Sequence, residues 1–263
     1  MNSPAGGRTT SGGGTSIAFE RSGTGPALIL VDPAGGFREV GPMRPLATHL
    51  ASHFTVFAYD RRGRGESTDT LPYSVEREID DLASLIEAAG GSAFVYGFSS
   101  GAILALLAAA RGLAIPRVAL LEPPLQVNGD PRPSTDMSGQ VARLVVLGRG
   151  SEALEHWMKG IGVPTEIITA MRGDPSGPAR AAVAHTLVYD SLIPGSLPAD
   201  QLSAIVTPTL VVASDASGDP MQSWARGLAE ALPNGSLRIL KGQWHGVPPE
   251  VLAPVLTEFF IGQ

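Results

Sequence analysis

Residues 92–111 read SAFVYGFSSGAILALLAAAR. The apolar residues before Gly97 are typical of a buried strand, and the almost wholly apolar run after Ser100 is typical of a buried helix. Between them, Gly97–Gly101 matches the pattern G-x-S-x-G with Ser99 at its centre. Glycines let such a turn tighten without side-chain clashes, so the serine projects its Oγ while the helix N-terminus points N–H groups at the reacting centre. The stretch predicts a nucleophile elbow; a turn that only caps a helix is the structural alternative.

Apolar runs of strand length recur on both sides of this turn and alternate with helical patterns. Continuous runs such as Ala27–Val31 are typical of strands buried on both faces of a sheet. Strands that alternate with helices imply a parallel sheet covered on both sides. We therefore expect an α/β fold with a mostly parallel central sheet and helices on both faces. Strands are expected at 17–21, 27–31, 54–59, 92–96, 117–121, 209–213 and 237–240, with a further short strand around 8–10. Helices are expected at 42–51, 74–89, 100–111, 221–232 and 248–260.

One long segment interrupts this alternation. Between the strands ending at Leu121 and starting near Val206, the sequence holds helical patterns separated by Gly and Pro, around 137–149, 151–160, 164–172 and 177–190. An insertion at this point would lie over the carboxyl ends of the strands, where α/β proteins bind ligands. We predict a core formed by residues 1–121 and 206–263, with residues 122–205 as an inserted helical cap.

Composition excludes several classes of function. The 263 residues contain no Cys, which excludes thiol nucleophiles, Cys-ligated zinc, iron–sulfur ligation and disulfides. The net charge of −6 argues against a nucleic-acid partner. No signal-peptide pattern is visible, and the longest apolar run, 101–110, is about half a membrane span. We expect a cytoplasmic protein with no nucleic-acid or membrane partner, and the sequence leaves a homodimer open.

With these motifs in place, the chain resembles the α/β-hydrolase superfamily over nearly its whole length. Besides the elbow, the resemblance rests on DRRGRGES at 60–67, TPTLVV at 207–212 and GQWH at 242–245. The Ser-Ser-Gly elbow, with Glu122 directly after the next strand, is also similar to zearalenone-type lactonases. The resemblance implies an α/β-hydrolase fold, no cofactor, and a structural role for the arginine-rich loop that begins at Asp60. Binding of a phosphate or another anion is the alternative for this loop.

The same resemblance implies a serine hydrolase acting on a carboxylic ester or lactone. Ser99 would attack the carbonyl, and His245, in the loop after the final strand, would be the general base. The remaining histidines compete poorly, because two have metal-like i, i+4 spacing without an acidic motif and two fall in the insertion. They are His49, His53, His156 and His185. We expect no metal.

The acid that would orient His245 is ambiguous. Glu122 follows the strand that ends at 121, where several branches of the superfamily carry this acid, and the prolines after it hold it extended. The loop after the strand at 209–213 offers Asp219 and Asp215, neither of which matches the usual turn. We favour Glu122, then Asp219, then Asp215.

An oxyanion hole needs two N–H donors. The resemblance places one at Ser100 and the other in the loop after the strand 27–31, where most of the superfamily has His-Gly and this chain has Asp-Pro-Ala-Gly-Gly. Because Pro33 has no N–H, Ala34 is the expected donor and Gly35 the fallback.

The substrate pocket is expected to be apolar. This favours a small hydrophobic ester, lactone or thioester over a sugar or a phosphate. The candidate lining residues are Phe37, Trp157, Met158, Met171 and Trp244.

Two alternatives remain. One is the same fold repurposed as a cyclase, isomerase or C–C lyase of secondary metabolism, in which Ser99 is dispensable. The other is a ligand-binding module that keeps the Ser/His pair but turns over slowly.

Overall fold

An eight-stranded sheet forms the centre of the computed structural model, which describes residues 4–127 and 135–262. The strand order is β1-β2-β4-β3-β5-β6-β7-β8. The pairs β1–β2 and β2–β4 are antiparallel, and all the other pairs are parallel. The strands are β1 (Ala5–Thr10), β2 (Ser16–Ser22), β3 (Ala27–Val31), β4 (Thr55–Tyr59), β5 (Phe94–Phe98), β6 (Val118–Leu121), β7 (Thr209–Ser214) and β8 (Gly235–Leu240).

Helices cover both faces of the sheet, because alternate side chains of its parallel strands point to opposite sides. Ile29 and Val31 of β3 belong to one hydrophobic cluster, whereas Leu28 and Leu30 belong to the other. The first cluster is packed by α2 (Val75–Ala88), α3 (Ser100–Ala110) and α9 (Met221–Ala231), and the second by α1 (Met43–Leu50) and α10 (Pro249–Ile261). This arrangement confirms the predicted α/β class with a mostly parallel sheet.

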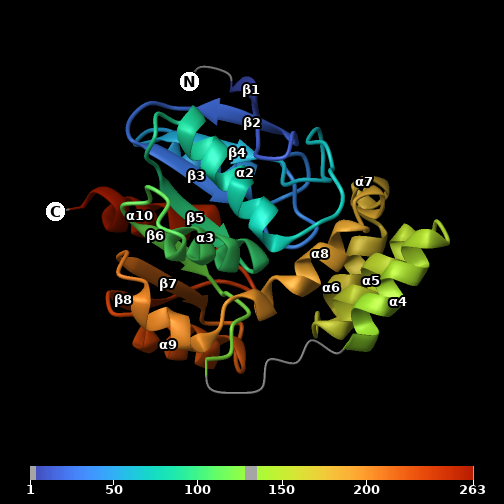
Figure 1. The fold of residues 1–263 in the computed structure, drawn as a ribbon. Coiled ribbons are helices and arrows are strands. Elements are labelled where there is room, and N and C mark those ends of the chain that lie inside the picture. Colours follow the sequence, from blue (N-terminus) through green and yellow to red (C-terminus); the bar gives the residue numbers. More distant parts are fainter. Residues whose placement is uncertain (1–3, 128–134, 263) are drawn as a thin grey trace.

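A separate group of helices lies between β6 and β7 in the sequence. We call these the cap helices, and Figure 1 shows them beside the sheet, with α8 nearest to the core. They are α4 (Thr135–Val146), α5 (Gly150–Gly160), α6 (Thr165–Arg172), α7 (Gly177–Ala182) and α8 (Thr186–Leu192). Two short 3₁₀ turns, Pro194–Ser196 and Ala199–Ala204, lead back to β7.

The cap helices have a small hydrophobic core of their own. Val141, Ala153, Ala184 and Leu187 are buried in it. Ala34, from the loop after β3, packs against the same cluster. The cap helices therefore meet the core at a loop that leaves the carboxyl end of the sheet.

Element positions differ from the sequence-based expectations in small ways. The helical pattern over 177–190 is broken at 183–185, so that it forms two helices, α7 and α8. The first strand, β1, is longer than the short one expected around residues 8–10, because its residues pair with β2 over their full length. Residues 128–134 of the predicted cap lie outside the described residues.

Within the described part of the chain, every helix is too short or too polar to cross a bilayer.

Candidate active site

Ser99 lies in a strained turn between β5 and α3. Its backbone has φ 54° and ψ −121°, a conformation that non-glycine residues rarely adopt. Two glycines make the turn sterically feasible. A Cβ on Gly97 would lie 2.3 Å from the carbonyl oxygen of Gly101, and a Cβ on Gly101 would lie 2.5 Å from that of Val31. Strain of this kind persists only where the surrounding structure enforces it, and it is common at active sites.

His245 is presented by a tight turn after β8. The N–H of Gln243 donates to the Gly246 carbonyl over 2.9 Å, which closes the turn, and His245 has φ 49°. Its backbone N–H donates to Ser217 Oγ over 3.0 Å. The imidazole stands beside Phe98, with 4.9 Å between the ring centroids. These contacts hold the ring at the end of the sheet where Ser99 lies.

Glu122 is the carboxylate that contacts His245. It follows β6 and is 2% exposed. Its φ is 44°, so the extended conformation expected before Pro123 is wrong. Its Oε2 lies 2.7 Å from His245 Nδ1, and its Oε1 accepts the N–H of Ser214 over 2.8 Å. Burial alone would raise the pKa of Glu122, but hydrogen bonds from His245, Ser217 and Ser214 outweigh it and hold the pKa below its ordinary value. The group is therefore a carboxylate at neutral pH, and it fixes the orientation of the imidazole.

The other two candidate acids have different partners. Asp215 Oδ1 accepts the N–H of Gly242 over 2.9 Å, which ties down the start of the turn that carries His245. Asp219 Oδ1 accepts the hydroxyl of Ser223 at the start of α9. The loop after β7 therefore contributes hydrogen bonds to the histidine and to Glu122, while its own carboxylates point elsewhere.

Two backbone N–H groups near Ser99 have no acceptor among residues 4–127 and 135–262. One belongs to Ser100, in the first turn of α3, and the other to Ala34, in the loop after β3. The Gly35 N–H, in contrast, donates to Asp190 Oδ2 over a long 3.4 Å. This leaves Ser100 and Ala34 free to donate to a ligand.

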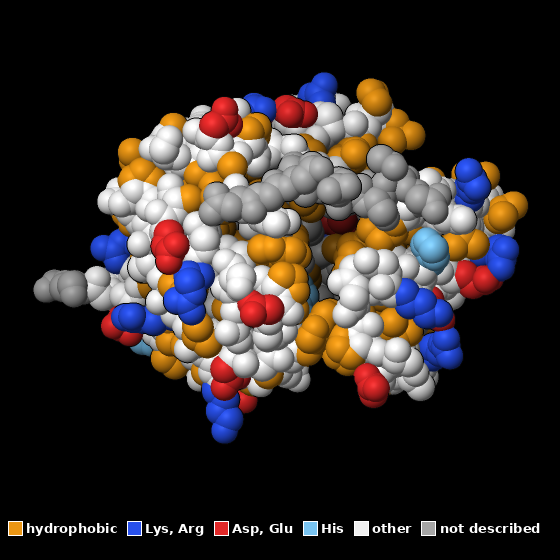
Figure 2. Space-filling model, turned by 90° about the horizontal axis from the view of Figure 1, so that it is seen from below, with side chains coloured by type: hydrophobic (Ala, Val, Ile, Leu, Met, Phe, Trp, Pro, Cys, Tyr) orange, Lys and Arg blue, Asp and Glu red, His pale blue; other side chains and the backbone are white. Residues whose placement is uncertain are grey.

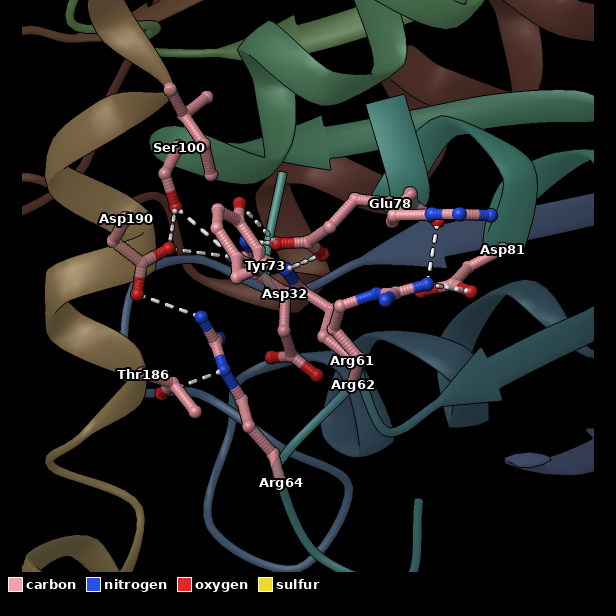
Figure 3. A network of polar contacts seen from close by, with 12 residues as sticks. Asp32, Arg61, Arg62, Arg64, Tyr73, Glu78, Asp81, Ser100, Thr186 and Asp190 are labelled. Atoms are coloured by element: carbon pink, nitrogen blue, oxygen red, sulfur yellow. Dashed lines mark hydrogen bonds and ion pairs between the residues drawn. The ribbon is translucent and has the colours of Figure 1, made fainter. Parts of the chain in front are cut away.

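A buried polar network lies under this loop and the elbow (Figure 3). Arg61 donates two hydrogen bonds to Glu78, over 2.8 and 2.6 Å, and one to Asp190 over 2.8 Å. Arg62 donates two to Asp81, over 2.8 and 2.7 Å. Both arginine side chains are buried and paired, which is the arrangement expected of a structural loop rather than of an anion-binding site.

Asp32 stands out within this network. It is fully buried, and neither of its carboxyl oxygens has a hydrogen-bond partner in the described structure. Burial raises the pKa of Asp32 from 3.8 to about 7, although Arg64 and Arg61 partly offset the effect. The loop that carries Ala34 thus begins at a carboxyl group that titrates near neutral pH.

Comparison with protein families gives a clear match. A model of the alpha/beta hydrolase family matches residues 22–254. The chain belongs to this family. An alpha/beta hydrolase of known structure from Sphaerobacter thermophilus DSM 20745 is 46% identical to this family member, with a TM-score of 0.90 over 97% of this chain and 100% of the other. An esterase from Thermogutta terrifontis, 22% identical over 98% and 96% of the two chains with a TM-score of 0.66, shares the fold.

Two sequence relatives extend the comparison. RutD of Caulobacter sp. (strain K31), described as a candidate carbamate hydrolase, is 30% identical over 83% of this alpha/beta hydrolase and 85% of its own length. YraK, an uncharacterised hydrolase of Bacillus subtilis (strain 168), is 36% identical over 97 residues. That match spans 35% of each chain, so this chain covers about a third of the length of YraK.

The predicted pocket residues divide into two groups. Trp157 packs against the same cluster as Ala34, and Trp244 adjoins His245 with 5.5 Å between ring centroids. The remaining three are not part of the cluster against which Ala34 packs. They are Phe37, which is buried, Met158, which is buried in α5, and Met171, which is half-buried in α6.

The surface is hollowed between the core and the cap helices. Figure 2 shows this hollow from below, with hydrophobic side chains gathered on both of its sides. An apolar hollow at the carboxyl end of the strands is a favourable place for an uncharged organic ligand.

Several residues at the site escaped the sequence reasoning. Phe98 could have been noticed, since it is the residue before Ser99 in the motif. Ser217 and Asp190 carry no local signal, because one lies in an irregular loop and the other in a cap helix. No group of three or more His, Asp or Glu side chains that could hold a metal ion is found in the described ranges, and both residues of the His49/His53 pair are exposed.

Proposed function

We propose that the protein is a serine hydrolase that cleaves a carboxylic ester or lactone of a small hydrophobic compound through an acyl-enzyme. The observation that carries the proposal is the 2.7 Å contact between His245 Nδ1 and the buried carboxylate of Glu122, at the same end of the sheet as the strained Ser99. A histidine oriented by a carboxylate next to an elbow serine is the arrangement that activates a hydroxyl for acyl transfer.

The roles follow from the chemistry of these groups. With its Nδ1–H held by Glu122, the imidazole of His245 keeps Nε2 free to accept a proton. Ser99 Oγ attacks the carbonyl carbon while His245 takes its proton, and Glu122 stabilises the imidazolium that forms. His245 then gives the proton to the leaving alcohol. Water, deprotonated by the same base, attacks the acyl-enzyme and releases the acid; for a lactone, the product is the hydroxy acid.

Negative charge develops on the carbonyl oxygen during each attack. The free N–H groups of Ser100 and Ala34 are the donors that we propose for it, and each such donor is worth about 10²–10³ in rate. Gly35 is the weaker candidate because its N–H already has an acceptor.

The substrate class is supported by the apolar surroundings of the site. Trp157 and the cluster that contacts Ala34 come from the cap helices, and we propose that this inserted region, residues 122–205, covers the acyl or ring part of the substrate. An esterase shares the fold. The zearalenone-type resemblance of the elbow and Glu122 keeps lactones, together with esters and thioesters, in the proposed class.

Mutation of the serine and of the competing acids tests the proposal. With p-nitrophenyl butyrate as substrate, Ser99→Ala should lose at least about 10³-fold in kcat/KM. Glu122→Gln should be far less active than Asp219→Asn, because Glu122 contacts the histidine whereas Asp219 binds Ser223. A fluorophosphonate probe should label wild type and fail to label Ser99→Ala.

The opposite results would refute the proposal. An active Ser99→Ala variant would favour the non-hydrolytic cyclase, isomerase or lyase. Greater damage from Asp219→Asn than from Glu122→Gln would overturn the assignment of the acid.

A further inference from the structure

Asp190 connects a cap helix to the elbow. It lies on α8, and its side chain is 1% exposed. Its Oδ1 accepts the hydroxyl of Ser100 over 2.9 Å and a guanidinium N–H of Arg61 over 2.8 Å. Its Oδ2 accepts a guanidinium N–H of Arg64 over 2.7 Å and, over 3.4 Å, the backbone N–H of Gly35. One carboxylate thus holds four donors from three segments of the core, and Figure 3 shows its contacts with the three side chains.

Two of these donors adjoin the N–H groups that we propose for the oxyanion hole. Ser100 supplies one of those N–H groups itself, and Asp190 binds its side chain. Gly35 follows Ala34, which supplies the other. Asp190 therefore contacts both sides of the hole without contacting the reacting atoms.

Arg64 holds the same loop from a second direction. Its guanidinium donates to the carbonyl of Pro33 over 2.8 Å and to that of Gly36 over 3.0 Å, while it also binds Asp190 and Thr186. The loop thus has two of its carbonyls held by the arginine and one N–H held by the carboxylate. Ala34 lies between these fixed points, and its N–H is left unpaired.

The charge state of the carboxylate fits this role. Burial alone would raise the pKa of Asp190, but Arg64, Arg61 and the Ser100 hydroxyl outweigh it and hold the pKa below its ordinary value. An ionised carboxylate accepts hydrogen bonds and donates none. It can therefore serve two arginines, a hydroxyl and a backbone N–H at once.

We infer that Asp190 is a positioning residue for the oxyanion hole, which aligns the N–H groups of Ser100 and Ala34 from the cap side. This inference rests on the proposed hydrolysis at Ser99. Donors act on the transition state only when they are held at the place where charge develops, and small displacements are costly. Loss of the carboxylate should lower the rate of the chemical step more than it weakens substrate binding.

The experiment measures kcat and KM for p-nitrophenyl butyrate in Asp190→Asn, Ser100→Ala and the double variant. Asp190→Asn keeps the shape of the side chain but cannot accept from all four donors, so kcat should fall about 10–100-fold with KM within about threefold. Ser100→Ala keeps the backbone N–H, so it should lower kcat less than Asp190→Asn does. Because both changes break the same contact, the double variant should be no worse than Asp190→Asn alone.

Asp81→Asn is the matched control. Asp81 is as buried as Asp190, with its side chain 1% exposed, and it pairs with Arg62 of the same arginine-rich loop. It makes no contact with the loop that carries Ala34 in any hydrogen bond of the described structure. The control should lower Tm as much as Asp190→Asn does, yet keep kcat within about twofold of wild type.

Three results would overturn the inference. They are a wild-type kcat in Asp190→Asn, an equal fall of kcat in Asp81→Asn, and fully additive losses in the double variant. If Asp190→Asn fails to fold, an unchanged kcat in the milder Ser100→Ala variant would also overturn it. Different results would refute the proposed function: an active Ser99→Ala variant, or a wild-type protein that the fluorophosphonate probe does not label.

Discussion

Replacing Asp32 with asparagine should make the stability of the protein less dependent on pH. Asp32 is fully buried without a hydrogen-bond partner in the described structure, and burial raises its pKa from 3.8 to about 7. Between these two values, the unfolded chain releases the proton while the folded protein retains it. Stability therefore falls as pH rises from about 4 to about 7, and the loss is complete above pH 7.

The magnitude follows from the two pKa values. A difference between 3.8 and about 7 corresponds to about 4 kcal/mol, at about 1.4 kcal/mol for each pH unit. Asparagine has nearly the same shape but no ionisable proton, so Asp32→Asn does not incur this loss. The free energy of unfolding of the variant, relative to wild type, should therefore rise by about 4 kcal/mol between pH 4 and pH 8.

Urea unfolding of both proteins at several pH values, followed by tryptophan fluorescence, gives the two curves. Subtracting them removes the contribution of every other titrating group that the substitution leaves unaltered. A difference that stays constant between pH 4 and pH 8 would refute the reasoning. So would a wild type that gains stability over the variant as pH rises, since that would mean that Arg61 and Arg64 stabilise an ionised Asp32.

Further substitutions test the turn at Ser99, the hydrogen bonds around Glu122, and the proposed pocket. Gly101→Ala should lower the free energy of unfolding by about 1–3 kcal/mol, because its Cβ would lie 2.5 Å from a β3 carbonyl oxygen; a wild-type denaturation midpoint would contradict this. Ser217→Ala removes a hydrogen bond that holds the pKa of Glu122 low, so this pKa should rise and the acid limb of the kcat/KM profile should move to higher pH. An acid limb at the wild-type pH would contradict this prediction. Trp157→Ala should raise KM for butyrate esters more than for acetate esters, because the longer acyl chain would contact the indole. An equal change for both esters would show that Trp157 does not line the proposed acyl pocket.

Much of the fold was accessible from local sequence pattern. Runs such as Ala27–Val31 are apolar at every position because both sheet faces are covered, and they predict the central parallel strands well. The antiparallel start of the sheet and the break between α7 and α8 were harder, because short segments near turns carry little periodic signal. Gly97 and Gly101 were recognisable because the steric requirement they satisfy is local.

Which carboxylate contacts His245 could not be decided from the sequence. Glu122 and Asp219 both follow strands whose carboxyl ends meet at one edge of the sheet, so either position was within reach of the histidine. Glu122 reaches His245 because of the direction of its side chain and because the Ser214 N–H holds its other oxygen. Both are properties of the three-dimensional arrangement and not of the local sequence. Asp190 was still less accessible, since it lies 90 positions from Ser100 in a helix with no catalytic motif.

The ion pairs of α8 constrain how the cap helices could be exchanged between members of this family in a chimaeric protein. On one side, Leu187 and Val188 pack with the other cap helices; on the other, Thr186 and Asp190 bind arginines of the core. A chimaera whose insertion comes from a relative without these two residues would leave the buried guanidinium of Arg64 without its carboxylate and Arg61 with Glu78 alone. Removing one partner of a buried ion pair is strongly destabilising. The boundary for such an exchange therefore lies before Thr186, so that α4–α7 can be replaced while α8 keeps its contacts with the arginines of the core.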